Sequence, residues 1–344
     1  MKKRAGSLLK IASIYVGTVL GAGFASGQEL LLFFARFSRR GLVGCLLAGA
    51  LFCILGALIL SRSHSLCKKT PKAYLNTIFG DSGARVLSAV IMVFLCVSFC
   101  VMLSGSGAFF VERFSLPVYA GIVVTTLLCL LVFLFDLKGL SVLNLILAPI
   151  MLVGTLYVCF YALVTSNTSV WLPQVSSHGR FLPYALFYVG YNMLTSVAVL
   201  VPAAGLSPDK KIAAFGGVLG GLVLSCMAFF ACLALYFNHG VWNSDLPLLL
   251  LSEKAGMVAY FVYSAVLYMA MLTTAVSTGF SVVQSLQSTG MSQKKAAVFV
   301  CIAGMPLSFI KFSVLMKNTY VFFGVLGVVL VGGILWNWFR DASF

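Results

Sequence analysis

The first apolar segment contains the sequence Gly17-Thr18-Val19-Leu20-Gly21-Ala22-Gly23-Phe24-Ala25-Ser26-Gly27-Gln28-Glu29. Its four glycines lie within eleven residues, where each weakens a helix by up to roughly 1 kcal/mol relative to alanine. Three polar residues, Ser26, Gln28 and Glu29, lie at the end of the stretch, although hydrocarbon excludes such side chains. A membrane tolerates unwound backbone at depth only where protein covers it or where it lines a wet cavity. The stretch therefore predicts a broken membrane helix whose free peptide groups bind a ligand.

The composition is that of a polytopic membrane protein. Of 344 residues, 61% are hydrophobic and 9% are charged, and the mean hydropathy is +1.07. A soluble core does not need so much apolar surface. The 23 basic and 8 acidic residues give a net charge of +15. In a membrane chain the basic residues anchor loops and fix topology, so no nucleic-acid partner is expected.

Ten apolar segments are long enough to cross a bilayer as helices. A cytoplasmic N-terminus puts fifteen of the basic residues inside and eight outside, which favours that orientation. We therefore predict an all-α, multi-pass protein with a single transmembrane domain over residues 1–344. The predicted spans are 8–35, 41–61, 84–111, 118–135, 140–165, 181–203, 212–237, 256–287, 294–311 and 315–338.

Glu29 is the only acidic residue inside a predicted span. An ionisable group within the membrane is a functional hypothesis by default, because leaving it in lipid costs several kcal/mol. The alternatives are a side chain that reaches to the surface or one that pairs with Arg36. The ten cysteines include no C-x-x-C pair, and nine of them lie in apolar segments, where they suit packing. Because no cluster of His, Asp or Cys lies at membrane depth, we expect neither an enzyme nor a cofactor.

Two loops are longer than a turn. Residues 166–180 contain Trp171 and Pro173 and suit an external interfacial segment. Residues 238–255 contain a Leu248–Leu251 run that is too short to span a membrane, which predicts an external interfacial helix or a lid.

Five spans per half imply two repeats of opposite orientation, about 8–165 and 181–338, because five is an odd number. The sixth span should then correspond to the first, and Gly190, Asn192 and Pro202 interrupt it. Matching interrupted spans in the two halves are a sequence indicator of a transporter site. We therefore predict that the sixth span is also broken. The alternative is that Gly190 serves only helix packing.

A break at mid-membrane offers two kinds of site. Its free N–H groups, here at Gly21 to Gly23, suit a carboxylate or another electron-rich group. Its free carbonyls, at Gly17 and Leu20, suit a cation, which needs further oxygen ligands from other helices. The eighth span offers hydroxyls at i, i+4 spacing, including Thr273 and Thr274. Such hydroxyls also commonly bond to their own helix, and that alternative stays open.

Three motifs carry a resemblance to known families. Gly17-Thr-Val-Leu-Gly21-Ala-Gly-Phe24 and Phe187-Tyr-Val-Gly-Tyr-Asn192 resemble the first-span and sixth-span motifs of the amino acid–polyamine–organocation superfamily. Ala270-Met-Leu-Thr-Thr274, with the following Ser292-Gln-Lys-Lys-Ala-Ala-Val298, resembles the eighth span and turn of neurotransmitter–sodium symporters. The Gly-Ala-Gly-Phe-Ala-Ser-Gly-Gln-Glu string is similar to the bacterial YkvI-like membrane proteins of this fold.

The resemblance implies the five-plus-five inverted-repeat (LeuT-type) fold in the bacterial cytoplasmic membrane. It implies a sodium site at Gly17, Leu20, Ala270, Thr273 and Thr274. The predicted substrate site is Gly21, Ala22, Gly23, Ser26, Glu29, Tyr188, Gly190, Tyr191 and Asn192. Ser104 and Ser106 either face this site or form a packing seam.

The sequence departs from the superfamily pattern in the sixth span, where Leu200 replaces the glutamate of many members. This replacement puts that family's gating network in doubt. Sodium-independent members often place a lysine in the fifth span, whereas residues 140–165 contain no Lys or Arg, which favours a cation site.

The leading hypothesis is a cation-coupled secondary transporter of a small solute, an amino acid or a related amine, working by alternating access. The bundle of spans 1, 2, 6 and 7 would move against the rest. The coupling ion is sodium, with the proton as the alternative, and Glu29 either balances a substrate amine or carries the proton.

The other hypothesis is a non-transporting receptor or accessory subunit that retains the fold and pocket. A channel would need a repeated pore-lining element, which the sequence lacks. The expected partners are the bilayer and the solute, and the chain is expected as a monomer or weak homo-oligomer.

Overall fold

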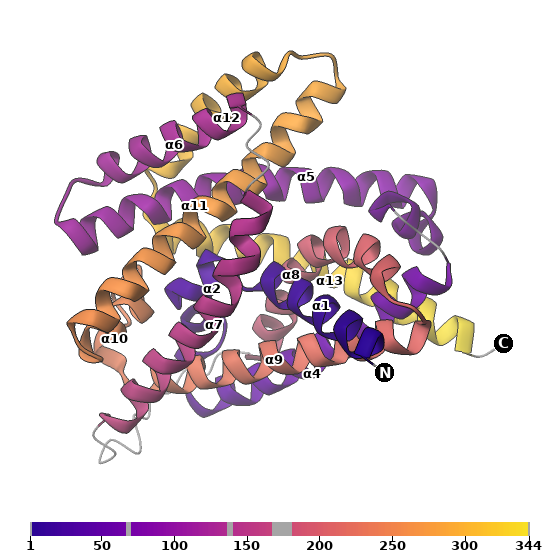
Figure 1. Cartoon of the computed structure of the whole chain (residues 1–344), viewed down its shortest axis with the longest axis horizontal. Helices are drawn as coiled ribbons and strands as arrows, with labels where there is room; N and C mark the ends of the chain where they lie inside the picture. Colours follow the sequence, from indigo (N-terminus) through magenta and orange to yellow (C-terminus); the bar gives the residue numbers. More distant parts are fainter. Residues whose placement is uncertain (1, 67–69, 136–139, 167–180, 343–344) are drawn as a thin grey trace.

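The computed structural model describes residues 2–66, 70–135, 140–166 and 181–342, and these ranges are helical with no strand. Figure 1 shows their arrangement. The α-helices are α1 (Lys2–Val19), α2 (Ala22–Ser26), α3 (Gln28–Phe33), α4 (Ser38–Ser65), α5 (Pro71–Phe114), α6 (Val118–Phe135), α7 (Leu140–Val164), α8 (Phe181–Ala203), α9 (Lys210–Phe237), α10 (Pro247–Lys254), α11 (Met257–Ser288), α12 (Gln293–Ser308) and α13 (Phe312–Ala342). Short 3-10 turns are η1 (Ala35–Phe37), η2 (Ala204–Leu206) and η3 (His239–Val241).

The all-helical, membrane-spanning architecture is confirmed. Within the described residues, eight segments are long and apolar enough to cross a membrane. Every predicted span coincides with a helix or, for the first span, with a series of three. Two of these helices, α1 and α12, are not among the eight segments. The first has four basic residues among its 18, and the second has 16 residues. The count of ten crossings therefore stays a prediction.

Helices at equivalent positions of the two halves pack against each other: α4 with α9, α5 with α11, and α6 with α12. The α4–α9 contact is the most extensive, and small residues make it close. A Cβ at Gly217 would overlap the backbone of Gly56, and a Cβ at Gly49 would overlap Ser225. Without a hydrophobic force between helices in lipid, such close backbone approach is a main source of packing energy. The repeat boundaries themselves stay a prediction.

The break predicted in the sixth span is wrong. Helix α8 runs without interruption from Phe181 to Ala203, and the chain passes into η2 only beyond Pro202. A Cβ at Gly190 would lie 2.5 Å from the carbonyl oxygen of Gly324 and 2.9 Å from the amide nitrogen of Val328. Gly190 is therefore needed because α13 crosses α8 at this point, which is the packing role that the sequence left open.

The two long loops predicted from the sequence differ in what the structure describes of them. The helical element predicted within residues 238–255 is present as η3 and α10, and most of the α10 side chains are buried. Its place at the external membrane interface stays a prediction. Residues 167–180, with the predicted interfacial Trp171 and Pro173, lie outside the described residues. Helices α1 and α13 bring the two ends of the chain to the side of the molecule opposite α10 (Figure 1).

Candidate functional site

The first span is broken at the predicted place. Leu20 N–H still donates to the Val16 carbonyl (2.8 Å), but Gly21 N–H donates to Val19 instead of Gly17 (2.8 Å). Gly21 is extended (φ −92°, ψ −178°), and α2 begins at the next residue. Among the described backbone hydrogen bonds, none joins Gly21 N–H to the Gly17 carbonyl or Phe24 N–H to the Leu20 carbonyl. The two carbonyls that the sequence proposed as cation ligands thus lack their usual helical donors.

A second interruption follows at Gly27, between α2 and α3. Its φ of 80° lies in the left-handed region that glycine adopts without a Cβ penalty. Leu248 of α10 packs directly against it, since a Cβ at Gly27 would lie 2.6 Å from the Leu248 Cγ. Tyr263 of α11 donates to the Ala25 carbonyl (2.7 Å), close to the C-terminus of α2. Helices α10 and α11 therefore hold the short helix α2 in place.

Glu29, in the first turn of α3, is buried at 5% exposure. Its Oε2 accepts a hydrogen bond from the Tyr191 hydroxyl of α8 (2.5 Å). Its other oxygen lies against Gly23, where a Cβ would overlap the carboxyl group. No ion pair of Glu29 with Arg36 or another basic residue is found among the described residues. The carboxyl group thus points back to the break, and neither the surface position nor the Arg36 pair is observed.

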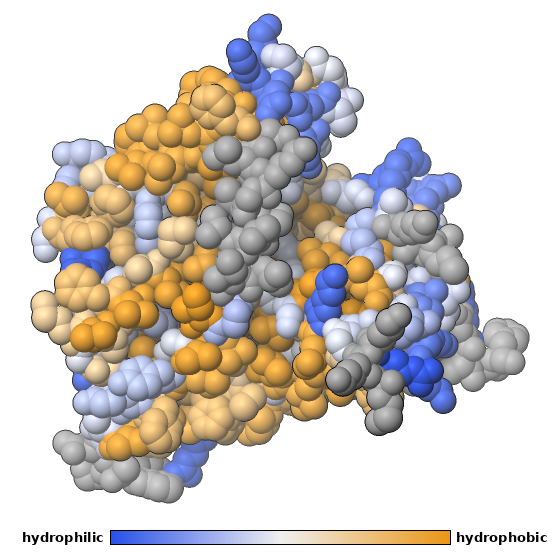
Figure 2. All heavy atoms as spheres, in the orientation of Figure 1, coloured by the Kyte–Doolittle hydropathy of each residue, from blue (hydrophilic) through white to orange (hydrophobic). Residues whose placement is uncertain are grey.

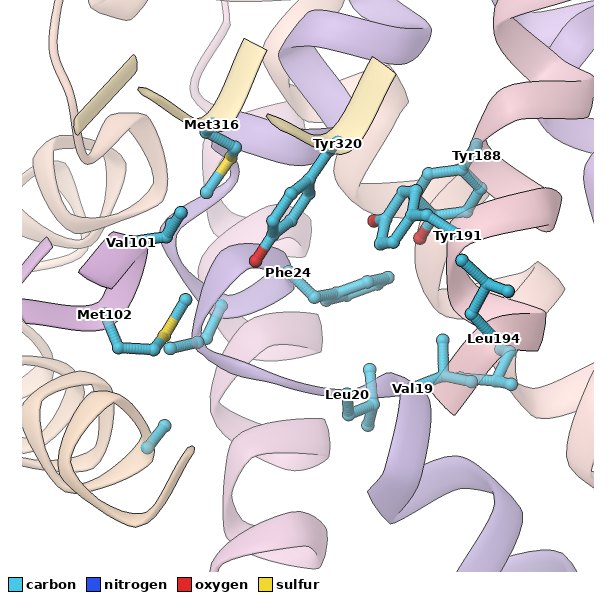
Figure 3. Close-up of a cluster of buried hydrophobic side chains, with 14 of the residues drawn as sticks. Val19, Leu20, Phe24, Val101, Met102, Tyr188, Tyr191, Leu194, Met316 and Tyr320 are labelled. Carbon is cyan, nitrogen blue, oxygen red and sulfur yellow. The ribbon is translucent and has the colours of Figure 1, made fainter. Parts of the chain in front are cut away.

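Aromatic rings surround the Glu29 carboxyl. Tyr191 contacts Tyr188 (5.6 Å between ring centroids), Tyr320 of α13 (4.7 Å) and Phe33 of α3 (5.6 Å). Phe94 of α5 contacts both Tyr191 and Tyr320. Figure 3 shows the rings of Tyr188, Tyr191 and Tyr320 converging on one region with Phe24 beside them. Four helices thus meet around a single buried acid.

The predicted substrate residues separate into two groups. Gly21, Ala22, Gly23 and Glu29 lie together at the break, with Tyr191 bonded to Glu29 and Tyr188 next to it. The other three are used locally. Ser26 donates to the Gly23 carbonyl (2.7 Å), Asn192 donates to the Tyr188 carbonyl (2.9 Å), and Gly190 contacts α13.

The serines of α5 form a packing seam, as the sequence allowed. Ser104 donates to the Ile310 carbonyl (2.7 Å), and Ser106 donates to the Met102 carbonyl of its own helix (2.9 Å). Between them, Gly105 lies against the ring of Phe312. Ser104 therefore connects α5 to the turn before α13, whereas the hydroxyl of Ser106 is used within α5.

The residues proposed for sodium lie where α11 passes the break. A Cβ at Gly21 would lie 4.0 Å from the Thr274 Oγ1, so this hydroxyl faces the unwound backbone. Thr273 is buried at 2% exposure, and its hydroxyl donates to the Ala270 carbonyl of its own helix (3.2 Å). The lone pairs of the same hydroxyl oxygen can coordinate a cation. The sodium site stays a prediction.

Tyr320 and Phe94 are not among the site residues predicted from the sequence. Both lie in apolar spans, where aromatic residues ordinarily serve packing. The hydroxyl of Tyr320 is the one sequence feature that could have pointed to a role in the site, because a buried phenol usually has a hydrogen-bond partner. No such partner is found for it among the described residues.

No family model matches the chain. Among curated proteins it is similar to the membrane protein YkvI of Bacillus subtilis (strain 168), with 26% identity over 337 residues and 97% of each chain covered. It is also similar to protein YyaD of the same organism, with 24% identity over 330 residues and 95% of each chain covered. These similarities extend over nearly the whole length of all three proteins.

Among solved structures, the inward-facing conformation of Mhp1 matches with a TM-score of 0.69 and 15% identity, covering 97% of this chain and 76% of that one. The chain has the Mhp1 fold. Mhp1, a nucleobase-cation-symport-1 family transporter, also matches in its closed conformation with bromovinylhydantoin bound, with a TM-score of 0.60 and 13% identity, covering 87% of this chain and 70% of that one. The Eremococcus coleocola manganese transporter matches with a TM-score of 0.61 and 13% identity, covering 92% of this chain and 76% of that one.

Proposed function

We propose that the chain is a cation-coupled secondary transporter that moves a small solute by alternating access. The observation that supports this most is the break at Leu20–Gly21. It leaves the Gly17 and Leu20 carbonyls without helical donors and lies opposite the Thr274 hydroxyl. A hard cation needs several oxygen ligands, and backbone carbonyls with hydroxyls supply them. Mhp1 and the Eremococcus coleocola manganese transporter, which share this fold, are both transporters.

The proposed coupling ion is sodium, held by the carbonyls of Gly17, Leu20 and Ala270 with the hydroxyls of Thr273 and Thr274. The proton, carried by Glu29, is the alternative. A sodium site at this place would link α1, which belongs to the bundle of spans 1, 2, 6 and 7, to α11, which is the eighth span and lies outside that bundle. Ion binding would therefore act on the position of the bundle relative to the rest of the fold, as alternating access requires.

The proposed solute is an amino acid or a related amine. Glu29 supplies a buried carboxylate without a basic partner among the described residues, and the buried Gln28 Oε1 has no hydrogen-bond donor there. A buried acceptor that is left unpaired costs free energy, and a ligand with N–H groups removes that cost. The aromatic rings around Glu29 also favour a cationic group.

A thermal-stability screen of purified protein against amino acids, amines and nucleobases, with and without sodium, tests this proposal. Uptake into proteoliposomes under a sodium gradient follows for each solute that stabilises the protein. We expect stabilisation by an amine-bearing solute that increases with sodium, together with uptake. Binding without uptake would favour the receptor hypothesis instead.

The double substitution Thr273→Val and Thr274→Val tests the ion. It keeps side-chain volume and removes two hydroxyl ligands, so sodium-dependent stabilisation and uptake should both disappear. Thr278→Val is the matched control, because Thr278 also bonds to its own helix, at the Thr274 carbonyl (2.8 Å). If uptake is the same in sodium, lithium and potassium, sodium coupling is wrong, and Glu29→Gln becomes the variant that tests the proton.

A further inference from the structure

Arg113, in the last turn of α5, is in contact with three aromatic rings. Its guanidinium carbon lies 5.4 Å from the ring centroid of Phe114, 4.8 Å from Tyr260 and 4.3 Å from Phe261. No hydrogen bond or ion pair of Arg113 with an acceptor is found among the described residues. Cation–π contacts use the face of a guanidinium, so its in-plane N–H groups are left without acceptors.

The adjacent acid does not neutralise Arg113. Glu112 Oε1 accepts hydrogen bonds from the Ser244 hydroxyl (2.8 Å) and the Asp245 amide (3.1 Å). Asp245 in turn pairs with Lys311 (3.9 Å). The segment that precedes α10 thus engages Glu112, and Lys311 and Ser313 engage Asp245, which belongs to that segment. Arg113 instead contacts α11, which follows α10.

The surface around Arg113 is apolar and exposed. Figure 2 shows apolar surface over α6 at the upper left and a mixture of apolar and polar residues along the left edge below it. Large exposed side chains at these helix ends are Val111 (40%), Phe114 (53%), Leu116 (45%), Tyr119 (60%), Met257 (74%), Val258 (78%), Phe261 (50%) and Val262 (54%). In a membrane protein, acyl chains cover such a surface. A cation that lies within it at the helix ends is at the depth of the lipid headgroups.

We propose that Arg113, with Phe114, Tyr260 and Phe261, forms a binding site for a phospholipid. The lipid phosphate accepts hydrogen bonds from the free N–H groups of the guanidinium. The acyl chains lie along the exposed first turns of α11. Arginine suits this role because its planar fork matches phosphate in a bidentate geometry while its face stacks on rings. The ring contacts also fix the side chain before the lipid binds, which reduces the entropic cost of binding.

This site differs from general anchoring by a basic residue at a membrane boundary. An anchor needs only a positive charge, which lysine also provides. A stacked, bidentate site needs the guanidinium, since an ammonium offers a point charge and no planar fork. The substitution Arg113→Lys therefore separates the two roles.

The site also has a structural consequence at the end of the molecule that carries α10. Glu112 holds the segment just before α10, and Arg113 contacts the first turns of α11 just after it. A lipid that fixes Arg113 should stabilise this end of the fold. The inference does not depend on the proposed transport function.

The test uses the purified, delipidated full chain in detergent. Its melting temperature and its bound lipid, by native mass spectrometry, are measured with a phosphatidylglycerol, a phosphatidylethanolamine, a diacylglycerol of the same chains, and inorganic phosphate. We expect both phospholipids to bind and stabilise the protein, whereas diacylglycerol and phosphate alone do not. Arg113→Gln should weaken phospholipid binding about tenfold, since charge-assisted hydrogen bonds are lost. Arg113→Lys should weaken binding nearly as much.

Arg85→Gln is the matched control. Arg85 lies on the same helix, is exposed, and bonds to the Asp81 carbonyl (3.4 Å) and the Ser82 hydroxyl (3.4 Å). Phe261→Leu keeps apolar surface and removes one ring, so it tests the site if Arg113→Gln folds poorly. The proposal is overturned if Arg113→Lys binds lipid as wild type does, if Phe261→Leu has no effect, or if inorganic phosphate alone stabilises the protein equally.

Discussion

The first and sixth spans both contain glycine and polar residues near their middle, yet only the first is broken. At Gly21 the backbone leaves the helix. The nearest atom to a Cβ built at Gly21 is the Thr274 Oγ1 of α11, 4.0 Å away. At Gly190 the helix continues, and the backbone of α13 occupies the Cβ position. A glycine in a membrane helix can therefore either permit unwinding or permit another helix to approach. The neighbour decides between these roles.

The largest effect is expected for Gly190→Ala. Three backbone atoms of α13 lie between 2.5 and 3.0 Å from the new Cβ, and backbone cannot rotate away as a side chain can. We expect a loss of about 3 kcal/mol or more of stability, measured as a lower melting temperature and a lower folded yield in detergent. Gly332→Ala is the control, because no heavy atom lies within 4 Å of its Cβ position. Equal stability of the two variants would contradict the packing role of Gly190.

The second effect concerns the broken span. Gly23→Ala would overlap the Glu29 carboxyl group, which is the movable end of a side chain. We therefore expect a smaller loss of stability than at Gly190, with a loss of solute uptake of about tenfold or more as Glu29 is displaced from Tyr191. Uptake and melting temperature are measured on the same preparation.

A double-substitution cycle checks this interpretation. In a Glu29→Ala background the collision is absent, so adding Gly23→Ala should change melting temperature and ligand binding little. Additive losses from the two substitutions would show that Gly23 acts through something other than the Glu29 carboxyl.

The same contrast explains what the sequence could predict. The break at Gly21, the buried Glu29 and the helical element at residues 247–254 follow from local patterns, because polar or glycine-rich stretches in apolar segments have few other interpretations. The packing role of Gly190 depends on Gly324 and Gly327 of α13, about 135 residues away in the chain, so no local pattern reveals it. The place of Tyr320 in the site is not predictable for the same reason, since only the folded chain brings it to Tyr191.

The third effect concerns the hydrogen bond between the two spans. Tyr191→Phe keeps the ring contacts with Tyr188 and Tyr320 and removes the donor to Glu29. A hydrogen bond is worth about 0.5–1.5 kcal/mol net to stability, so we expect a measurable fall in melting temperature. Tyr320→Phe should change stability less, because its hydroxyl has no protein partner among the described residues. If Tyr320→Phe weakens solute binding without lowering the melting temperature, that hydroxyl contacts the solute.

The smallest effect on stability is expected for Gly21→Ala. The residue's φ of −92° is open to any amino acid, and the new Cβ meets only the Thr274 Oγ1, at 4.0 Å. If glycine flexibility alone produced the break, alanine should restore the helix from α1 into α2 and raise the melting temperature by removing the backbone entropy of glycine. If α10 and α11 hold α2 in place, as the Leu248 contact and the Tyr263 hydrogen bond indicate, the break should persist and stability should change by less than about 0.5 kcal/mol. Sodium-dependent stabilisation should nevertheless fall, because the added methyl group narrows the gap between the unwound backbone and α11. A rise in melting temperature with loss of sodium response would instead assign the break to glycine itself.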